Sequence, residues 1–200
     1  DLAVALTQDV TNNVDVSATR NLSYTTTGRF INNAKLKAGE ELVVGGAAGI
    51  DNNAGAEMSG RDTMLKTDGV LDNRGLIDSV GHTQIDAGTL NNTGTGRIYG
   101  DRVSIATGKL NNGPDAAGGP AGSIASRTGD IDLGVSGQVS NSDGALILSG
   151  ADLYIGGALD ANRLAAGRAG QVINLAATIE ATGSLHLAAQ QLDNLNRGFS

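Results

Sequence analysis

The stretch from Gly94 to Asn112, GTGRIYGDRVSIATGKLNN, is the unit that the rest of the chain repeats. It contains one isolated apolar residue, Ile98, then an apolar pair two positions apart, Val103 and Ile105, and it closes on Leu110 followed by two asparagines. The pair flanks a polar residue, as in a strand with one buried face, and the glycines between the apolar pieces suit tight corners. The unit therefore predicts short strands joined by bends.

The apolar pair recurs along the chain in steps of 20, 21, 20 and 20 residues over its early copies. The copies are Leu22/Tyr24, Leu42/Val44, Thr63/Leu65, Thr83/Ile85, Val103/Ile105, Ile131/Leu133, Leu153/Ile155, Ile173/Leu175 and, out of step, Leu185/Leu187. A second column of single apolar residues keeps the same step and runs through Leu36, Met58, Ile77, Ile98 and Ile124. Columns that stay in step in this way are typical of a solenoid, in which each turn stacks on the previous one.

A third column consists of asparagines that follow an apolar residue, as in Leu71-Asp72-Asn73. Its predicted members are Asn33, Asn52, Asn73, Asn92, Asn112, Asn141 and Asn194. Stacked at equivalent positions, the amides can hydrogen-bond to one another and to corner carbonyls, and asparagine also tolerates left-handed backbone. We expect a ladder of amides; the alternative is that asparagine is simply a common turn residue.

These columns predict an all-β fold, a right-handed parallel β-helix (β-solenoid) with about 20 residues per turn. A leucine-rich repeat would need a helical return, but glycine interrupts these units and helical apolar spacing is missing. The composition fits a narrow core, since 40% of residues are hydrophobic and only 2% aromatic. We expect residues 1–200 to form a single β-helical segment cut from a longer chain.

Two segments break the period. Residues 113–122 contain both prolines of the chain among glycines and alanines, which predicts a loop that leaves the solenoid between turns. Such a loop could be a surface for interaction through Pro114, Asp115 and Pro120, or a tolerated surface insertion. The second break is an irregular stretch at residues 160–172, whose register the sequence leaves open.

The residue types that usually form catalytic or metal sites do not form a recognisable motif in this sequence. There is no cysteine for a disulfide or a thiolate metal site, and the two histidines, His82 and His186, lie in different units. A net charge of −7 without a basic block argues against nucleic acid, and no apolar run approaches the roughly 20 residues of a membrane span. The phosphate-binding GxxxxGK[ST] pattern is missing. We therefore predict no catalytic residue, no cofactor and no metal.

The repeats resemble a known family. The strings at residues 96–105 (GRIYGDRVSI), 108–112 (GKLNN), 71–75 (LDNRG) and 144–147 (GALI) are similar to the haemagglutinin repeats of filamentous-haemagglutinin-type exoproteins, the large bacterial proteins of two-partner secretion. The family includes adhesins and contact-dependent growth-inhibition toxins. The likeness spans about residues 28–198. It implies a β-helical shaft that is exported through a dedicated outer-membrane transporter and is secreted or displayed on the cell surface.

The resemblance also implies where other functions lie. The family's amino-terminal secretion domain and its carboxy-terminal toxins have no match here, so contact with the transporter and any toxic activity are expected outside this segment. The expected role is a non-catalytic shaft for adhesion or for presenting a distal receptor-binding or toxin element, with a host or target-cell receptor as a possible partner.

One alternative comes from another class, because parallel β-helices also carry polysaccharide lyases and hydrolases. Its acid and base groups would be Asp101, Arg102, Arg127, Asp130 and Asp132. Two observations weigh against it. Asp130 and Asp132 flank the inward-facing Ile131 and are expected to face solvent, and the chain has few aromatic rings on which a sugar could stack.

Overall fold

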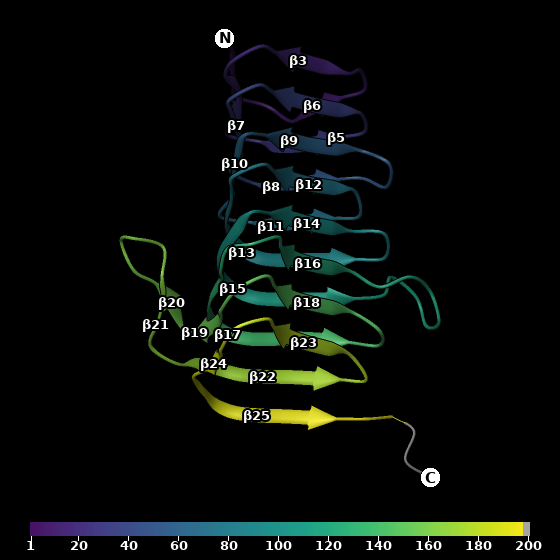
Figure 1. Ribbon diagram of the computed structural model, residues 1–200. Helices are drawn as coiled ribbons and strands as arrows, with labels where there is room; N and C mark the ends of the chain where they lie inside the picture. The colour runs from purple at the N-terminus through teal and green to yellow at the C-terminus, as the bar shows by residue number, and fades with distance from the viewer. Residues whose placement is uncertain (198–200) are drawn as a thin grey trace.

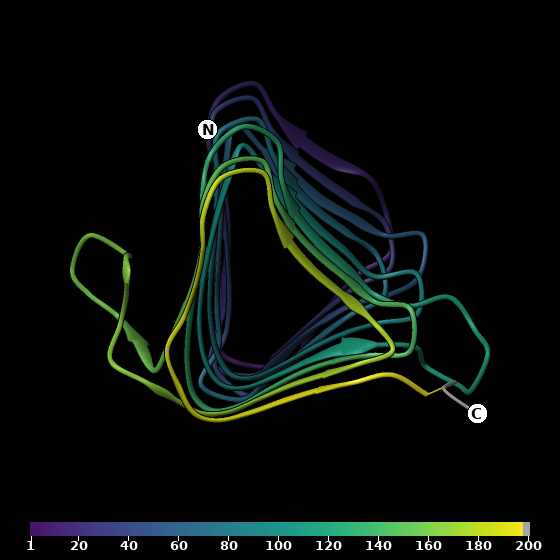
Figure 2. The same cartoon turned by 60° about the horizontal axis from the view of Figure 1, so that its bottom comes forward.

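The computed structural model describes residues 1–197 as stacked parallel β-strands with no helix among them. Residues 198–200, where the predicted repeat region ends, lie outside the described part. The strands wind into a solenoid whose turns are stacked along one axis (Figure 1) and whose cross-section is a triangle with three faces (Figure 2). The expected all-β solenoid with roughly 20 residues per turn is thus confirmed.

Each turn contributes one strand, or half of a long strand, to each face. The first face contains β1 (Leu2–Leu6), β4 (Leu22–Thr26), β7 (Glu41–Gly46), β10 (Asp62–Lys66), the first halves of β13 (His82–Thr93), β15 (Arg102–Gly113) and β17 (Ile131–Ser142), then β19 (Leu153–Gly156) and β24 (Leu185–Leu187). The second face contains β2 (Val10–Asn12), β5 (Arg29–Asn32), β8 (Gly49–Asn52), β11 (Val70–Asn73), the second halves of β13, β15 and β17, then β22 (Ala169–Leu175) and β25 (Ala189–Leu195).

The third face is a separate sheet of eight strands, so the described residues make eight complete turns, and β24 and β25 begin another. Its strands are β3 (Val16–Ala18), β6 (Lys35–Ala38), β9 (Glu57–Gly60), β12 (Leu76–Ser79), β14 (Arg97–Gly100), β16 (Ser123–Ser126), β18 (Leu146–Ser149) and β23 (Thr178–Ala181). Because β13, β15 and β17 bend around a corner without interruption, the first and second faces form one continuous sheet of 15 strands.

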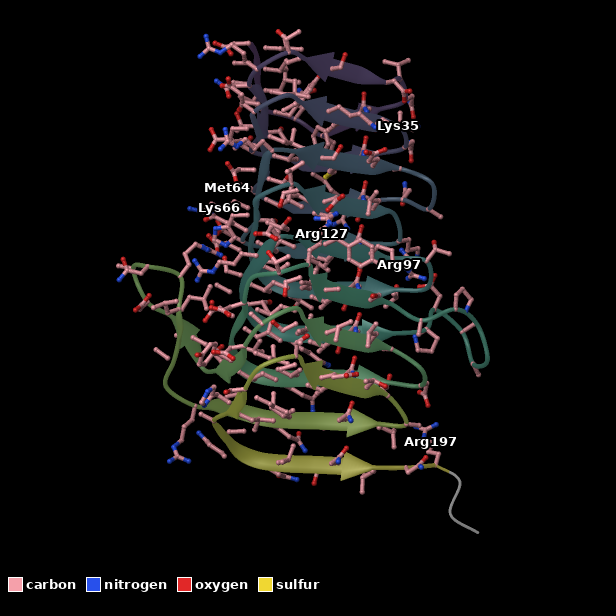
Figure 3. All side chains as sticks on the ribbon, viewed as in Figure 1. Lys35, Met64, Lys66, Arg97, Arg127 and Arg197 are labelled. Atoms are coloured by element: carbon pink, nitrogen blue, oxygen red, sulfur yellow. The ribbon has the colours of Figure 1, made fainter. Side chains whose placement is uncertain are left out.

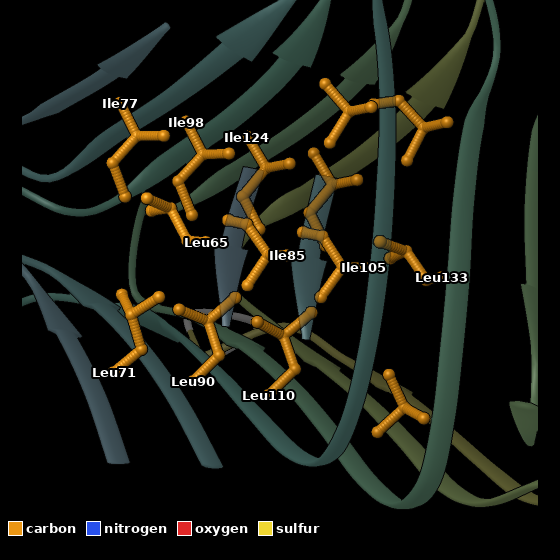
Figure 4. Packing of buried hydrophobic residues seen from close by; sticks show 14 of the residues in the cluster. Leu65, Leu71, Ile77, Ile85, Leu90, Ile98, Ile105, Leu110, Ile124 and Leu133 are labelled. Carbon is orange, nitrogen blue, oxygen red and sulfur yellow. The ribbon is translucent and has the colours of Figure 1, made fainter. Parts of the chain in front are cut away.

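Three columns of aliphatic side chains fill the triangle (Figure 4). The first face supplies Leu65, Ile85, Ile105 and Leu133; the second supplies Leu71, Leu90 and Leu110; the third supplies Ile77, Ile98 and Ile124. All ten are 0% exposed, and equivalent residues of adjacent turns are direct register partners. Full burial of one such side chain is worth about 1.5–3 kcal/mol. Aliphatic side chains therefore supply most of the core, and Phe30 is the one aromatic ring among its fully buried members in the described residues.

The structure corrects the register of two assignments and confirms a third. Leu185 pairs with Leu153, so Leu185/Leu187 belongs to the first-face column as expected, although out of step. Ile173 was expected in the same column but pairs with Ser140 on the second face, because an excursion after β19 adds residues before the second face begins. Near the start of the chain, the buried residue of β5 is Phe30 and not Ile31, so the asparagine that follows is also shifted by one position.

Both breaks in the period are excursions from corners. Residues 113–122 form a loop between β15 and β16, closed at its base by an antiparallel bridge between Pro114 and Ala121. Residues 158–168 form an arm built on the antiparallel pair β20 (Ala158–Leu159) and β21 (Ala165–Ala166). The regular register resumes with β22 at Ala169, so residues 169–172 of the stretch expected to be irregular belong to a second-face strand.

Candidate functional site

An unbroken ladder of nine asparagine side chains runs along the corner between the second and third faces. In each step the Nδ2 of one asparagine donates to the Oδ1 of the asparagine one turn further along, at 2.7 to 3.0 Å. The members are Asn12, Asn32, Asn52, Asn73, Asn92, Asn112, Asn141, Asn174 and Asn194. The central members are buried, whereas Asn194 is exposed.

The second amide hydrogen of each central asparagine also has a partner. Asn92 Nδ2 donates to the carbonyl of Ser123, 3.1 Å away, at the start of a third-face strand, and Asn112 does the same to Leu146 at 3.0 Å. Each amide thus joins one turn to the next and the second face to the third. No buried side-chain nitrogen or oxygen among the described residues lacks a partner.

One asparagine expected in the ladder lies beside it, and another member escaped the sequence analysis. Asn33 is exposed and belongs to a short outer ladder, in which it donates to Asn13 at 2.7 Å and accepts from Asn53 at 2.6 Å. Its place in the buried ladder is taken by Asn32. Asn174 was missed, although the triplet Val172-Ile173-Asn174 repeats the apolar-x-Asn pattern.

Acidic corner residues make a second type of link between turns. A carboxylate oxygen of Asp62 accepts the backbone N–H of His82 at 2.8 Å, and Asp152 does the same for Ser184 at 2.7 Å. Each of these bonds joins a corner to the strand of the turn that lies above or below it. The sequence analysis did not identify this role, because the spacing of about one turn between donor and acceptor is visible only once the register is known.

The 113–122 loop projects from the corner near the asparagine ladder (Figures 1 and 2). The structure ties the carboxylate of Asp115 back to the shaft, where it accepts from Arg74 Nε at 3.1 Å and from the hydroxyl of Thr93. Pro114 belongs to the bridge at the base, whereas Pro120 lies in the exposed tip. Of the three residues expected to offer contacts, Pro120 is thus the one most free to meet another molecule.

The arm folds over the outer surface of the first face through Arg163. This side chain forms an ion pair with Asp86 on β13 at 2.9 Å and donates from Nε to the hydroxyl of Ser104 on β15 at 2.7 Å. Further along the arm, the backbone N–H of Ala165 donates to Asp132 on β17 at 2.9 Å. Close approach of the arm needs Gly134, since a Cβ there would lie 2.3 Å from the carbonyl carbon of Ala158.

Asp132 is therefore buried, contrary to the expectation that it faces solvent. The side chain points away from the solenoid core, as predicted from the strand alternation, but the arm covers it and only 1% of the residue remains exposed. Its charge is balanced by Arg102, whose Nη2 lies 2.8 Å from Asp132 Oδ2 and also donates to the carbonyl of Arg163. The arm could not be placed from the sequence, so its cover could not be foreseen.

His82 lies next to these groups. Its Nε2 is 2.8 Å from the hydroxyl of Ser104, which already accepts from Arg163 and can donate its own proton to a neutral imidazole. Burial of the ring and, to a smaller extent, the positive charges of Arg102 and Arg163 together lower the pKa of His82 from 6.5 to about 4. Ser104 is 0% exposed, so its hydroxyl is a structural link and not an accessible nucleophile.

The residues of the enzyme alternative do not gather in one groove. Arg127 reaches along the third face to Asp78 at 2.7 Å (Figure 3), whereas Arg102 reaches Asp132 on the first face. Asp101 accepts from the hydroxyl of Thr128. Asp130 accepts the backbone N–H of Asp152 at 3.0 Å. These carboxylates therefore serve separate links between turns.

Two surface hollows lie beside the arm, and the one of about 430 Å³ is lined by Tyr154 and His186, whose rings stack with their centroids 4.7 Å apart. The other, of about 470 Å³, lies beside the base of the arm, on the side where Lys66 projects (Figure 3), and its described lining contains no aromatic ring for a sugar. Within residues 1–197, no group of three or more histidine or acidic side chains is placed to hold a metal ion. No helix in this part of the chain is long and apolar enough to span a membrane.

Comparison with known proteins gives one match. The family model of the haemagglutinin repeat matches residues 9–75, 59–113 and 115–196, which together cover most of the chain. No curated protein and no solved structure matches the chain.

The buried ladder predicts a large difference between two identical substitutions. Asn92→Ala removes the donor to Asn112 and Ser123 and the acceptor for Asn73, leaving buried polar groups unpaired at about 1–3 kcal/mol each. Asn33→Ala removes an exposed pair of bonds and is expected to cost less than about 1 kcal/mol. Thermal unfolding followed by circular dichroism compares them, and equal losses would contradict a stabilising role for the buried ladder.

The lowered pKa of His82 predicts a pH dependence of stability. In the unfolded chain the His82 ring takes up a proton near its ordinary pKa of 6.5. In the folded chain the ring stays neutral until the pH falls to about 4. Stability should therefore fall as pH decreases from about 6.5 to 4, and His82→Gln should reduce that slope. Denaturant midpoints measured across this range test the expectation.

A matched pair of arm variants tests the cause of the lowered pKa. Arg163→Gln removes a nearby positive charge and part of the cover, so NMR titration should show a raised pKa for His82. Arg168→Gln makes the same change in charge at an exposed position and should leave the titration of His82 as in the wild type. A similar effect of both variants would show that the contacts of Arg163 are not the cause.

Proposed function

The chain belongs to the haemagglutinin repeat family, and from that membership we propose that it is the non-catalytic shaft of a large bacterial exoprotein that is secreted or displayed on the cell surface. The observation that carries this proposal is the continuity of the stack. The aliphatic columns and the asparagine ladder pass from turn to turn, so that each turn is held by its neighbours.

A solenoid of this kind suits presentation at a distance. Each turn extends the shaft by about 4.8 Å, and stability grows by interfaces between neighbouring turns. We propose that the shaft holds a distal receptor-binding or toxin element away from the cell. Folding turn by turn also suits export through an outer-membrane two-partner-secretion transporter, which would engage a region outside this segment.

A polysaccharide-acting enzyme is the less well-supported alternative. Arg102 and Asp132 neutralise each other in one ion pair, Arg127 is paired with Asp78 elsewhere, and the hollow of about 470 Å³ at the base of the arm has no aromatic ring in its described lining. Incubating the protein with acidic glycans and finding turnover would reverse this ranking.

The shaft proposal predicts that one complete turn can be removed. Leu42 and Thr63 are register partners, so deleting residues 43–63 joins equivalent positions and leaves Met64 where Val43 was. Asp72 then takes the place of Asp51 beside Arg29, and the core columns stay continuous. In the full-length exoprotein, surface display and the activity of the distal element should persist, as measured by antibody labelling of intact cells and by a binding or killing assay.

Deleting residues 43–53 is the control. This removes about half a turn, puts corner residues where a strand should continue, and should abolish display. If the whole-turn deletion kept surface display but abolished the activity of the distal element, this segment would have a role beyond providing length, and the shaft proposal would be wrong.

The 113–122 loop is the part of the shaft that we propose for contact with a receptor. The turn before it closes the same corner with only Gly94 and Thr95, which stand between positions equivalent to Gly113 and Gly122. Replacing residues 114–121 by Gly-Thr should therefore preserve the fold. A receptor role predicts that cells expressing the full exoprotein bind target cells less well after this replacement, and unchanged binding would rule that role out.

A further inference from the structure

The tip of the 113–122 loop has the properties of a protease substrate. All six residues from Asp115 to Pro120 are exposed, and the loop stands clear of the three faces at its corner (Figure 2). Among the described residues, the backbone bonds of the loop lie at its base, where Gly122 N–H donates to Gly113 at 2.9 Å, and in one turn, where Gly119 N–H donates to Ala116 at 3.0 Å. Extending the tip into an active-site cleft requires this turn and the exposed contacts of Asp115 with Arg74 and Thr93 to break.

The small side chains of the tip match the substrate preference of one class of protease. Ala116 and Ala117 precede Gly118 and Gly119, so the residues before and after the bond between positions 117 and 118 are small. Proteases with a shallow primary pocket, such as those of the elastase type, accept small residues of this kind. Gly118 has a φ of 74°, and no atom lies within 4 Å of the position of a Cβ there, so no neighbour packs against this side of the backbone.

We propose that the bond between Ala117 and Gly118 is a proteolytic processing site for an elastase-type serine protease. Water adds across this amide bond, leaving a carboxylate on Ala117 and an amine on Gly118. The inference depends on the geometry of the loop and is independent of the role of the shaft.

The second excursion shows why exposure alone does not make such a site. The tip of the arm also contains an alanine, Ala161, but the carboxylate of Asp160 accepts the backbone N–H groups of Asn162 and Leu164 at 2.8 and 2.9 Å. Arg163 then fixes the tip to β13 and β15. A protease would have to break these contacts before the arm could enter its cleft.

A cut in the loop leaves the shaft assembled. On either side of the loop, β15 and β17 pair in register from Val103 and Ile131 to Asn112 and Asn141, apart from one irregularity. The strand that directly follows the loop, β16, pairs with β14 on one side and β18 on the other. The two fragments therefore share strand pairs, core columns and the asparagine ladder.

Limited digestion of the whole 200-residue chain with an elastase-type protease tests the proposal. Intact-mass analysis should find a first cut at the bond between positions 117 and 118. The fragments should separate on a denaturing gel but elute together at the size of the uncut protein in gel filtration. A first cut in the arm or elsewhere, or no cut under conditions in which the heat-unfolded chain is digested, would overturn the site. Separation of the fragments under native conditions would overturn the assembled product.

A matched pair of substitutions tests the accessibility of the loop backbone independently of the preference of elastase-type proteases for small residues. Ala117→Lys and Ala161→Lys each place one trypsin site at an exposed excursion. Trypsin should cut after position 117 at least roughly tenfold faster than after position 161, because opening the arm requires its contacts to break first. Equal rates would contradict the special accessibility of the loop.

Discussion

The structure depends on equivalent side chains lying directly above one another in successive turns. The buried amides of the asparagine ladder impose this most strictly, because each has its two hydrogens and its oxygen committed to fixed partners. Slipping one turn by a single residue would turn Asn92 outward and bury a neighbour without partners, at the cost of several unpaired polar groups. Aliphatic columns alone tolerate exchange between leucine, isoleucine and valine, so the amides are what define the register.

The sequence predicted the repeating part of this architecture well because its period is local information. The spacing of Val103 and Ile105, and of Leu110 and Asn112, recurs at about one turn, and the fold of most turns follows from it. Prediction failed where residues were added. The arm between β19 and β22 led to the wrong assignment of Ile173 and left Leu185 out of step, since counting forward by one period cannot tell how many residues leave the stack.

The candidate sites were harder to predict for a related reason. The cover over Asp132 and the environment of His82 come from Arg163, which is 78 residues from Ile85 in sequence but bonds to its carbonyl. Contacts of this kind depend on where an insertion folds back, and no periodicity encodes that. Arg29 and Arg127 join turns on other surfaces, where each long side chain reaches a carboxylate on the outside of the shaft.

The amides of the buried ladder all face the same way. From Asn12 to Asn194 every donor belongs to the earlier turn and every acceptor to the later one, so the small dipoles add along the axis instead of cancelling. The shaft thus has a chemical polarity of its own, and a turn whose amide was reversed would bring two oxygens or two NH2 groups face to face with its neighbours.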